Sequence, residues 1–365
     1  MKYYKLNDLC TDIIDCPHST PQWKAEGIRV VRNFNLRDGN LDFSDGYFVD
    51  EETYKKRIKR AIPEEDDIII SREAPMGVVA IVPKGLKCCL GQRLVLLKID
   101  KRKINPYYLL FMLRSEFVQK QFVRADVTGS IVSNFCIPDL KELLIPVIDA
   151  GQENIAELLK NIDKKIHLNK KVNDNLEQQL RLMYEYMMNN ATNGNISGRF
   201  TVAAELSEVI TGREDANFST INGKYKFFTC SNDTLKCDEY AFNESAILIA
   251  GNGDFNVKHY TGKFNAYQRT YVLFPHTKYY GLLYLASLYR INSFKSASAG
   301  SIVKFITKSD IENIPVFIPE NSNILSKINQ MMFLQEKMIC ESEELMALRD
   351  WLLPMLMNGQ ATISD

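Results

Sequence analysis

Cysteine and histidine are the residues of this sequence that could hold a metal ion. The 365-residue chain has 8 cysteines and 4 histidines. A tetrahedral zinc site needs ligands that cluster about two to four residues apart. No C-x-x-C pair occurs among the cysteines, which are Cys10, Cys16, Cys88, Cys89, Cys136, Cys230, Cys237 and Cys340. We therefore expect reduced, partly buried thiols rather than a zinc site or a disulfide framework.

Two short motifs could suggest a catalytic loop. The run Asn105-Pro106-Tyr107-Tyr108 is similar to the Asn-Pro-Pro-Tyr loop of adenine-N6 methyltransferases, but it lacks the second proline and leads into an apolar helical pattern. Because proline favours the first helical position, we predict a helix start here. The run Gly251-Asn252-Gly253-Asp254-Phe255 lacks the third glycine of a dinucleotide-binding loop and predicts a glycine hairpin. No phosphate-loop, zinc-protease or serine-hydrolase motif occurs, so we expect no enzyme.

Basic residues gather in two windows, although 45 basic and 45 acidic residues give the chain zero net charge. Residues 255–309 contain eight Lys or Arg, seven Tyr and no Asp or Glu, and residues 79–138 contain ten basic against three acidic residues. Phosphate contacts supply most of the non-specific affinity for nucleic acids. The pattern indicates local basic faces on a neutral protein.

Length and composition predict two or three globular domains, because 365 residues with 45% hydrophobic content can bury substantial cores. No apolar stretch reaches the roughly 18–20 residues of a membrane span, and the first residues lack the apolar region of a secretory signal. We expect a cytoplasmic protein that makes no membrane contact.

Short identities recur along the chain in the same order and at nearly constant offset. Gln92-Arg93 recurs as Gln268-Arg269, Gly129-Ser130-Ile131-Val132 as Gly300-Ser301-Ile302-Val303, Ile145-Pro146-Val147 as Ile314-Pro315-Val316, and Met188-Asn189 as Met357-Asn358. This order predicts two copies of one unit.

Each copy begins with strand-like segments and ends with a long helical pattern. Brief helices are predicted at 107–122 and 279–289. We place a first domain at 1–149, a long helix at 150–190, a linker at 191–199, a second domain at 200–319, a second long helix at 320–359 and a tail at 360–365. The predicted fold class is α+β.

Both long helices carry mostly apolar residues at alternating spacings of four and three, which is a coiled-coil seam. The first seam is Ile155, Leu159, Ile162, Ile166, Asn169, Asn173, Leu176, Leu180, Met183 and Met187; the second is Ile324, Ile328, Met331, Gln335, Met338, Ser342, Leu345, Arg349, Leu352 and Leu356. We predict that the two helices pair antiparallel. They would separate two similar mixed α/β domains related by a pseudo-two-fold repeat. The polar residues near the middle of each helix would set the register of the pair. The alternative is that each helix packs only on its own domain.

Several of these residues match a known family pattern. They are Leu6, Leu9 and Asp15-Cys16-Pro17-His18 at the start, the Gly-Ser-Ile elements, then Ile145-Pro146-Val147, Gln152-Glu153, Ile155-Ala156, Leu159, Asp163 and Ile166, and finally residues 353–360. This pattern resembles the specificity subunits of type I restriction-modification systems over essentially the whole chain. The second copy departs from it: Asn321-Ser322-Asn323 replaces the usual Glu-Gln, and Met332 is the counterpart of Asp163.

The resemblance implies two target-recognition domains, each of which reads one half of a bipartite site in double-stranded DNA. It also implies that the chain docks two methyltransferase subunits, which carry S-adenosylmethionine and methylate adenine N6, so no cofactor is expected in this chain. It leaves open whether two restriction subunits, which use ATP, also join. The alternatives are a self-contained DNA adenine methyltransferase and a structural coiled-coil scaffold without DNA binding.

Polar side chains near the repeated elements are the candidate DNA contacts, since Arg, Lys, Asn and Gln read bases while Lys, Arg and Ser bind phosphates. They are Arg32, Asn33, Ser71, Arg72, Gln92, Arg93 and Ser130 in the first domain, and Asn252, Lys258, Gln268, Arg269, Lys295 and Ser301 in the second. An element that both domains share favours scaffold or phosphate contact over base readout. Tyr184, Tyr186 and Trp351 are candidate methyltransferase contacts, with packing inside the chain as the equal alternative.

We predict that Arg269→Ala weakens DNA binding and flattens its salt dependence, because one cation at the phosphate backbone is lost. Binding measured at several salt concentrations should give a log–log slope smaller by about 1. An unchanged affinity and slope would remove Arg269 from the interface.

Overall fold

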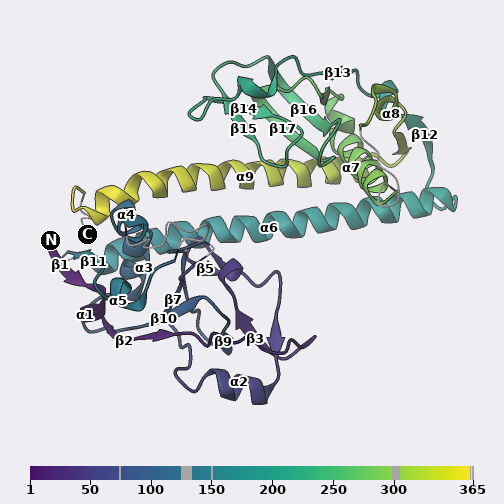
Figure 1. The fold of residues 1–365 in the computed structure, drawn as a ribbon. Coiled ribbons are helices and arrows are strands. Elements are labelled where there is room, and N and C mark those ends of the chain that lie inside the picture. The colour runs from purple at the N-terminus through teal and green to yellow at the C-terminus, as the bar shows by residue number, and fades with distance from the viewer. Residues whose placement is uncertain (74, 125–133, 149–150, 298–304, 362, 364–365) are drawn as a thin grey trace. The chain divides into compact units, whose positions relative to one another are not determined.

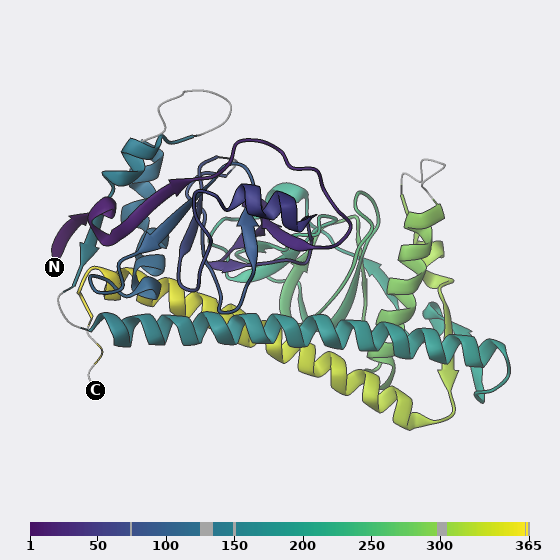
Figure 2. The same cartoon turned by 90° about the horizontal axis from the view of Figure 1, so that it is seen from below.

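The computed structural model describes the whole chain except residues 74, 125–133, 149–150, 298–304, 362 and 364–365. The chain divides into two compact units. Unit 1 consists of Met1–Ile166 and Glu344–Asp365, and unit 2 consists of His167–Glu343. Each unit holds one α/β domain together with part of two long helices, α6 (Gln152–Thr192) and α9 (Ser322–Met357) (Figure 1). Both ends of the chain belong to unit 1 (Figure 2).

The domain of unit 1 is built on a four-stranded antiparallel sheet of order β2-β10-β7-β8. Its strands are β2 (Cys10–Asp15), β10 (Leu94–Ile99), β7 (Ile68–Ser71) and β8 (Val79–Ile81). Because successive strand residues face opposite sides, Ile68 and Ile70 pack in one core while Ile69 packs in another. The uninterrupted apolar run of β7 therefore reflects a strand buried on both faces.

Smaller sheets complete this domain. A three-stranded sheet consists of β6 (Phe48–Val49), β3 (Ile28–Val31) and β9 (Cys88–Leu90). One two-stranded sheet pairs β1 (Lys2–Lys5) with β11 (Leu144–Val147). Another pairs β4 (Leu36–Arg37) with β5 (Asn40–Leu41). The short helices are α1 (Leu6–Leu9), α2 (Glu51–Arg57), α5 (Ile137–Lys141) and the 3-10 turn η1 (Asn33–Asn35).

The domain of unit 2 has a six-stranded sheet of order β13-β18-β16-β17-β14-β15. Its strands are β13 (Val209–Thr211), β18 (Thr270–Leu273), β16 (Phe242–Ala250), β17 (Val257–Ala266), β14 (Tyr225–Phe228) and β15 (Leu235–Cys237). A separate pair joins β12 (Gly198–Val202) to β19 (Pro315–Pro319). The turns η2 (Ala203–Glu205), η3 (Ala216–Phe218) and η4 (Thr277–Tyr279) and the helix α8 (Lys308–Glu312) lie between strands or next to the helix α7 (Tyr280–Ala297).

The predicted internal repeat is confirmed by the hydrogen bonds of the two sheets. The backbone N–H of Arg72 donates to Arg93 O and that of Gly251 donates to Arg269 O, both at 2.9 Å. Equivalent bonds run from Gly91 N to Val31 O at 2.7 Å and from Tyr267 N to Phe228 O at 2.9 Å. The order β13-β18-β16-β17 thus repeats β2-β10-β7-β8. One difference is that the continuous β17 pairs with both β16 and β14, whereas unit 1 divides these pairings between β8 and β9.

The two motifs at 105–108 and 251–255 fold as predicted. The Asn105 side chain accepts hydrogen bonds from Tyr107 N at 2.9 Å and Tyr108 N at 3.1 Å and caps α3 (Pro106–Arg114). Residues 251–256 connect the antiparallel strands β16 and β17, which form a hairpin.

The prediction of one helix over 107–122 is wrong, because the chain breaks between α3 and α4 (Glu116–Arg124) at Ser115. Ser115 adopts an extended backbone, and its hydroxyl donates to Met112 O at 2.6 Å. Serine readily forms such local side-chain bonds, which compete with the helix. In unit 2 the counterpart α7 (Tyr280–Ala297) extends beyond the expected residue 289.

The predicted antiparallel pairing of the long helices is confirmed within each unit, and all twenty seam residues are buried or half-buried. In unit 2, Asn169 Nδ2 donates to Glu341 Oε2 at 2.9 Å and Gln335 Nε2 donates to Asn173 O at 3.3 Å. Ser342 differs from the expectation, because its hydroxyl donates to Met338 O within its own helix.

The long helices also pack on the domains, so pairing and domain packing occur together. Besides pairing, α6 contributes Ile155 and Leu159 to the core of unit 1, and α9 contributes Ile328 and Met332 to the core of unit 2. Met332 is 1% exposed, which explains why the second copy has an apolar residue at this place.

Asp163 of α6 holds three helices of unit 1 together. Its carboxylate accepts from Arg114 of α3 at 2.7 Å and from Arg349 of α9 at 2.9 Å. The side chains of Asp163, Arg114 and Arg349 are 11%, 16% and 11% exposed. A buried ion pair that loses one partner leaves an uncompensated charge in a low-dielectric environment.

We predict that Asp163→Asn lowers the free energy of unfolding by roughly 3–5 kcal/mol, since the buried Arg114 loses its counter-charge and Arg349 keeps only that of Asp350. The matched control is Glu177→Gln on the same helix, whose pair with Arg181 is half-exposed and should contribute about 0.5 kcal/mol or less. Urea denaturation of both variants measures the difference. Equal effects would mean that Asp163 has no special role in stability.

Candidate nucleic-acid interface

Four of the predicted DNA contacts line one pocket in the domain of unit 1. The pocket has a volume of about 190 Å³ and is lined by Thr20, Pro21, Trp23, Arg32, Asn33, Gln92 and Arg93. Three segments supply these residues: the loop after β2, the end of β3 with η1, and the connection from β9 to β10. We call it the first pocket.

Backbone geometry places Gln92 and Arg93 in the first pocket. Arg93 has a φ of +66°, a left-handed conformation that non-glycine residues rarely adopt, and it turns the chain from β9 into β10. The Gln92 amide donates to His18 O, which ties this turn to the loop after β2. The Arg93 guanidinium pairs with Glu73 at 3.4 Å.

Arg32 is held by aromatic rings. Its guanidinium carbon lies 4.7 Å from the ring centre of Tyr47, 5.0 Å from that of Phe34 and 5.6 Å from that of Trp23. Such stacking fixes the plane of the guanidinium while its N–H groups stay available for hydrogen bonds. Arg32 makes no ion pair with the residues that the structure describes.

Ser71 and Arg72 lie beside this pocket, but their side chains bond to other residues of the same domain. Ser71 is fully buried, and its hydroxyl donates to Pro75 O at 2.6 Å and accepts from Val78 N at 3.0 Å. The Arg72 guanidinium binds both carboxylate oxygens of Asp15, at 3.0 and 3.1 Å. Ser71 is therefore out of reach of DNA in this conformation.

Unit 2 has a pocket at the equivalent place, which we call the second pocket. It has a volume of about 470 Å³ and is lined by Thr211, Gly251, Asn252, Gln268, Arg269, Tyr271, Phe305, Ile306, Thr307 and Lys308. It brings together the predicted residues Asn252, Gln268 and Arg269. Gln268 Nε2 donates to Asp215 Oδ1 at 2.8 Å, and the exposed Arg269 has no ion pair within the described part of the chain.

Lys258 lies outside the second pocket. Its ammonium donates to Ser231 O at 2.6 Å, and burial lowers the pKa of this lysine. Ser130 and Ser301 fall outside the described residues, and of Lys295 only its place in α7 is described.

Sequence reasoning missed other residues that line the two pockets. In the first they are Thr20, Pro21 and Trp23; in the second they include Thr211, Tyr271 and residues 305–308. Residues 305–308 begin two positions after the end of the repeated Gly-Ser-Ile-Val element, and this closeness in sequence is the signal that could have found them. Tyr271 also braces that segment, because its hydroxyl donates to Ile306 O at 2.9 Å.

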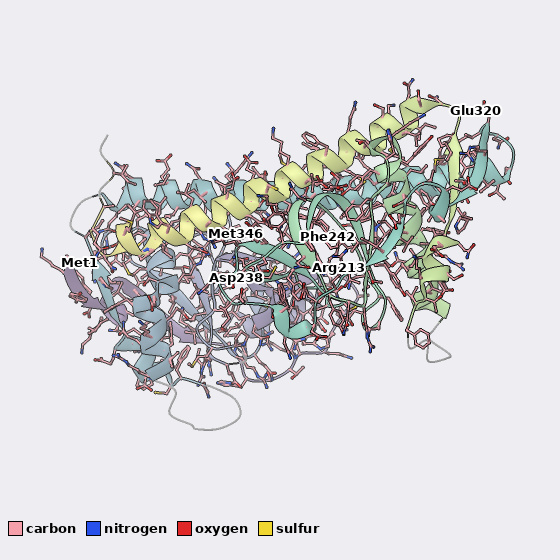
Figure 3. The ribbon with its side chains drawn as sticks, turned by 90° about the horizontal axis from the view of Figure 1, so that it is seen from above. Met1, Arg213, Asp238, Phe242, Glu320 and Met346 are labelled. Atoms are coloured by element: carbon pink, nitrogen blue, oxygen red, sulfur yellow. The ribbon has the colours of Figure 1, made fainter. Side chains whose placement is uncertain are left out.

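The three candidate partner contacts have different environments. Tyr184 is 3% exposed, packs against Tyr289 and lies in the core of unit 2, where burial raises its pKa. Tyr186 and Trp351 are 67% and 60% exposed. Other apolar side chains also project from α9, among them Met346 (Figure 3).

No cysteine is among the residues that line the first or the second pocket. The structure describes all eight cysteines, and none of them forms a disulfide; burial raises the pKa of Cys10 and Cys88 to about 12. Over the described ranges, no three His, Cys, Asp or Glu side chains come together as a metal site would require. The helices within those ranges include none with the length and apolarity of a membrane span.

Two curated proteins resemble part of the chain. The Type I restriction enzyme EcoDI specificity subunit of Escherichia coli is 38% identical over 165 residues, which are 43% of this chain and 37% of that protein. The putative type I restriction enzyme MjaX specificity subunit of Methanocaldococcus jannaschii is 27% identical over 163 residues, 44% of this chain and 35% of that protein. The matched part thus spans little more than a third of each relative.

A solved structure extends the likeness of the fold. The S subunit of a type I restriction-modification system from M. genitalium aligns with a TM-score of 0.63 and 18% identity, over 96% of this chain and 94% of that one. The family model of the type I restriction modification DNA specificity domain matches residues 1–178 and 204–337, once for each copy of the repeat. The chain therefore belongs to the type I restriction modification DNA specificity domain family.

Proposed function

We propose that this chain is the DNA sequence-specificity subunit of a type I restriction-modification complex and that its two domains recognise the halves of a bipartite site. The observation that carries the proposal is the repetition of one polar pocket. Gln92-Arg93 and Gln268-Arg269 follow equivalent strands and line equivalent pockets. A protein that reads two half-sites needs two such readers.

The repeated pair has two different tasks. Both glutamines bond to the loop that follows the first strand of the sheet, at His18 O and at Asp215 Oδ1, so they hold the pocket together. Both arginines are exposed at the pocket. Because the arginine is common to domains that read different sequences, we assign it to the DNA phosphates rather than to the bases.

In this proposal the chain recognises DNA, and the catalytic steps take place on other subunits. Adenine N6 methylation belongs to two docked methyltransferase subunits, which carry S-adenosylmethionine. Where restriction subunits join, ATP is used there. The complex acts on DNA in the cytoplasm.

The experiment that tests the proposal is a genome-wide map of N6-methyladenine in cells with and without this gene. We expect one split motif, two short half-sites around a fixed gap, to lose its methylation in the deletion strain and to regain it on complementation. Methylated motifs of other systems in the same genome are the internal control. If no motif changes although the chain co-purifies with a methyltransferase, the proposal is wrong.

A second prediction concerns the docking of methyltransferase subunits. Tyr186→Ala and Trp351→Ala should each weaken co-purification with the methyltransferase at least tenfold, because exposed aromatic residues often dominate an interface. Tyr184→Ala should instead lower the stability of unit 2, since its ring is buried. Ile221→Ala, which changes a 95% exposed apolar residue in a loop, is the control. Unaltered co-purification of both aromatic variants would contradict the assignment.

A further inference from the structure

The two pockets can be compared position by position. Val31 and Phe228 hold the same place in the two domains, because each carbonyl accepts the equivalent backbone bond from the chain turn that precedes the Gln-Arg pair. The next residues along the chain, Arg32 and Thr229, are therefore counterparts. The Gln-Arg pair is the same in both pockets, whereas this neighbouring position differs.

A difference at one position between two readers of the same fold is where sequence discrimination can arise. Contacts to phosphates carry no sequence information and can be common to both domains. Contacts to base edges must differ if the half-sites differ. Arg32 is thus a candidate for base readout in the first domain, and Arg93 is not.

The surroundings of Arg32 separate it from the other arginines near the first pocket. Arg72 is bound by both carboxylate oxygens of Asp15. Arg93 pairs with Glu73 at 3.4 Å, and its side chain is 52% exposed, which suits a contact to a phosphate. Arg32 faces the aromatic rings of Trp23, Phe34 and Tyr47. Within the described residues, no carboxylate pairs with its guanidinium. The rings orient its N–H donors.

The aromatic rings reduce the side-chain entropy that Arg32 would lose on binding DNA. A flexible arginine side chain loses rotamer entropy when a ligand fixes it. Here three rings hold the guanidinium before any ligand binds, and its half-buried position at the pocket keeps an edge accessible. The first pocket, at about 190 Å³, is also smaller than the roughly 300–1,000 Å³ of typical small-molecule sites. A base edge fits this space better than a metabolite does.

We propose that Arg32 is a specificity-determining residue that reads a guanine in the half-site of the first domain, an inference that rests on the proposed function. Two coplanar N–H groups of a guanidinium match the O6 and N7 acceptors on the major-groove edge of guanine. Trp23, Phe34 and Tyr47 are positioning residues that fix the plane of this fork. The second domain, with Thr229 at this position, reads its half-site by other side chains.

The test is a selection of binding sites from a pool of randomised DNA duplexes, with the full chain in complex with its methyltransferase subunits. The wild-type complex should enrich a split motif. Arg32→Gln and Arg32→Ala should lose the preference for guanine at one position of one half-site, by about 5- to 150-fold, and leave the other half-site unchanged. Retention of the base preference at the other positions of the first half-site shows that the first domain of the variants is folded. Arg93→Ala is the matched control and should weaken binding to all sequences alike.

A guanine analogue isolates the contact itself. Replacing the guanine at that position by 7-deazaguanine removes the N7 acceptor, so it should weaken binding of the wild-type complex and leave binding of Arg32→Ala unchanged. The same motif from wild type and variants, or a uniform loss of affinity without loss of base preference, would overturn the proposal in favour of a phosphate contact. Enrichment of no motif by the wild-type complex would instead contradict the proposed function.

Discussion

The burial of two apolar seams against each other is the constraint on which both units depend. Neither α6 nor α9 could leave its stripe of four-and-three-spaced residues in water, because exposed apolar surface costs roughly 25 cal/mol per Å². Pairing within each unit solves this and brings distant parts of the sequence together, as Asp163 and Arg349 show. The polar positions Asn169 and Gln335 add hydrogen bonds across the pair, and these favour one register over its neighbours.

Features with a period or a repeat could be predicted from sequence. The seams were visible because helix geometry forces a regular spacing, and the repeat was visible because short identities such as the Gln-Arg pair recur in the same order. The capped start at Asn105 and the hairpin after β16 were also predictable, since each depends on a few neighbouring residues. Ser115 shows the limit: one hydroxyl bond to Met112 O interrupts a pattern that looks continuous.

The pockets were only half predictable, and the reason is physical. Gln92, Arg93 and Arg32 were candidates because of residue type, yet burial decides which polar residue is accessible, and burial depends on tertiary packing. Ser71 and Lys258 have side chains that could bind DNA, but both donate to backbone carbonyls instead. Ser71 donates to Pro75 O within a turn, and Lys258 donates to Ser231 O. Trp23 comes from a loop without periodicity, so nothing in its neighbourhood predicted that it would stack on Arg32.

Unit 1 is built from two separate stretches of the sequence, and this affects how the chain folds during its synthesis. Unit 2 is one continuous stretch, His167–Glu343, whereas unit 1 needs Glu344–Asp365 as well as the residues before 167. On the ribosome, the first domain emerges first but is the last to be completed. Until Arg349 and Leu356 have been synthesised, Asp163 and the seam of α6 in that unit lack their final partners. The nascent chain therefore exposes an apolar face of α6 while residues 193–348 are being synthesised, a state in which chaperones can bind and premature association with other chains is a hazard.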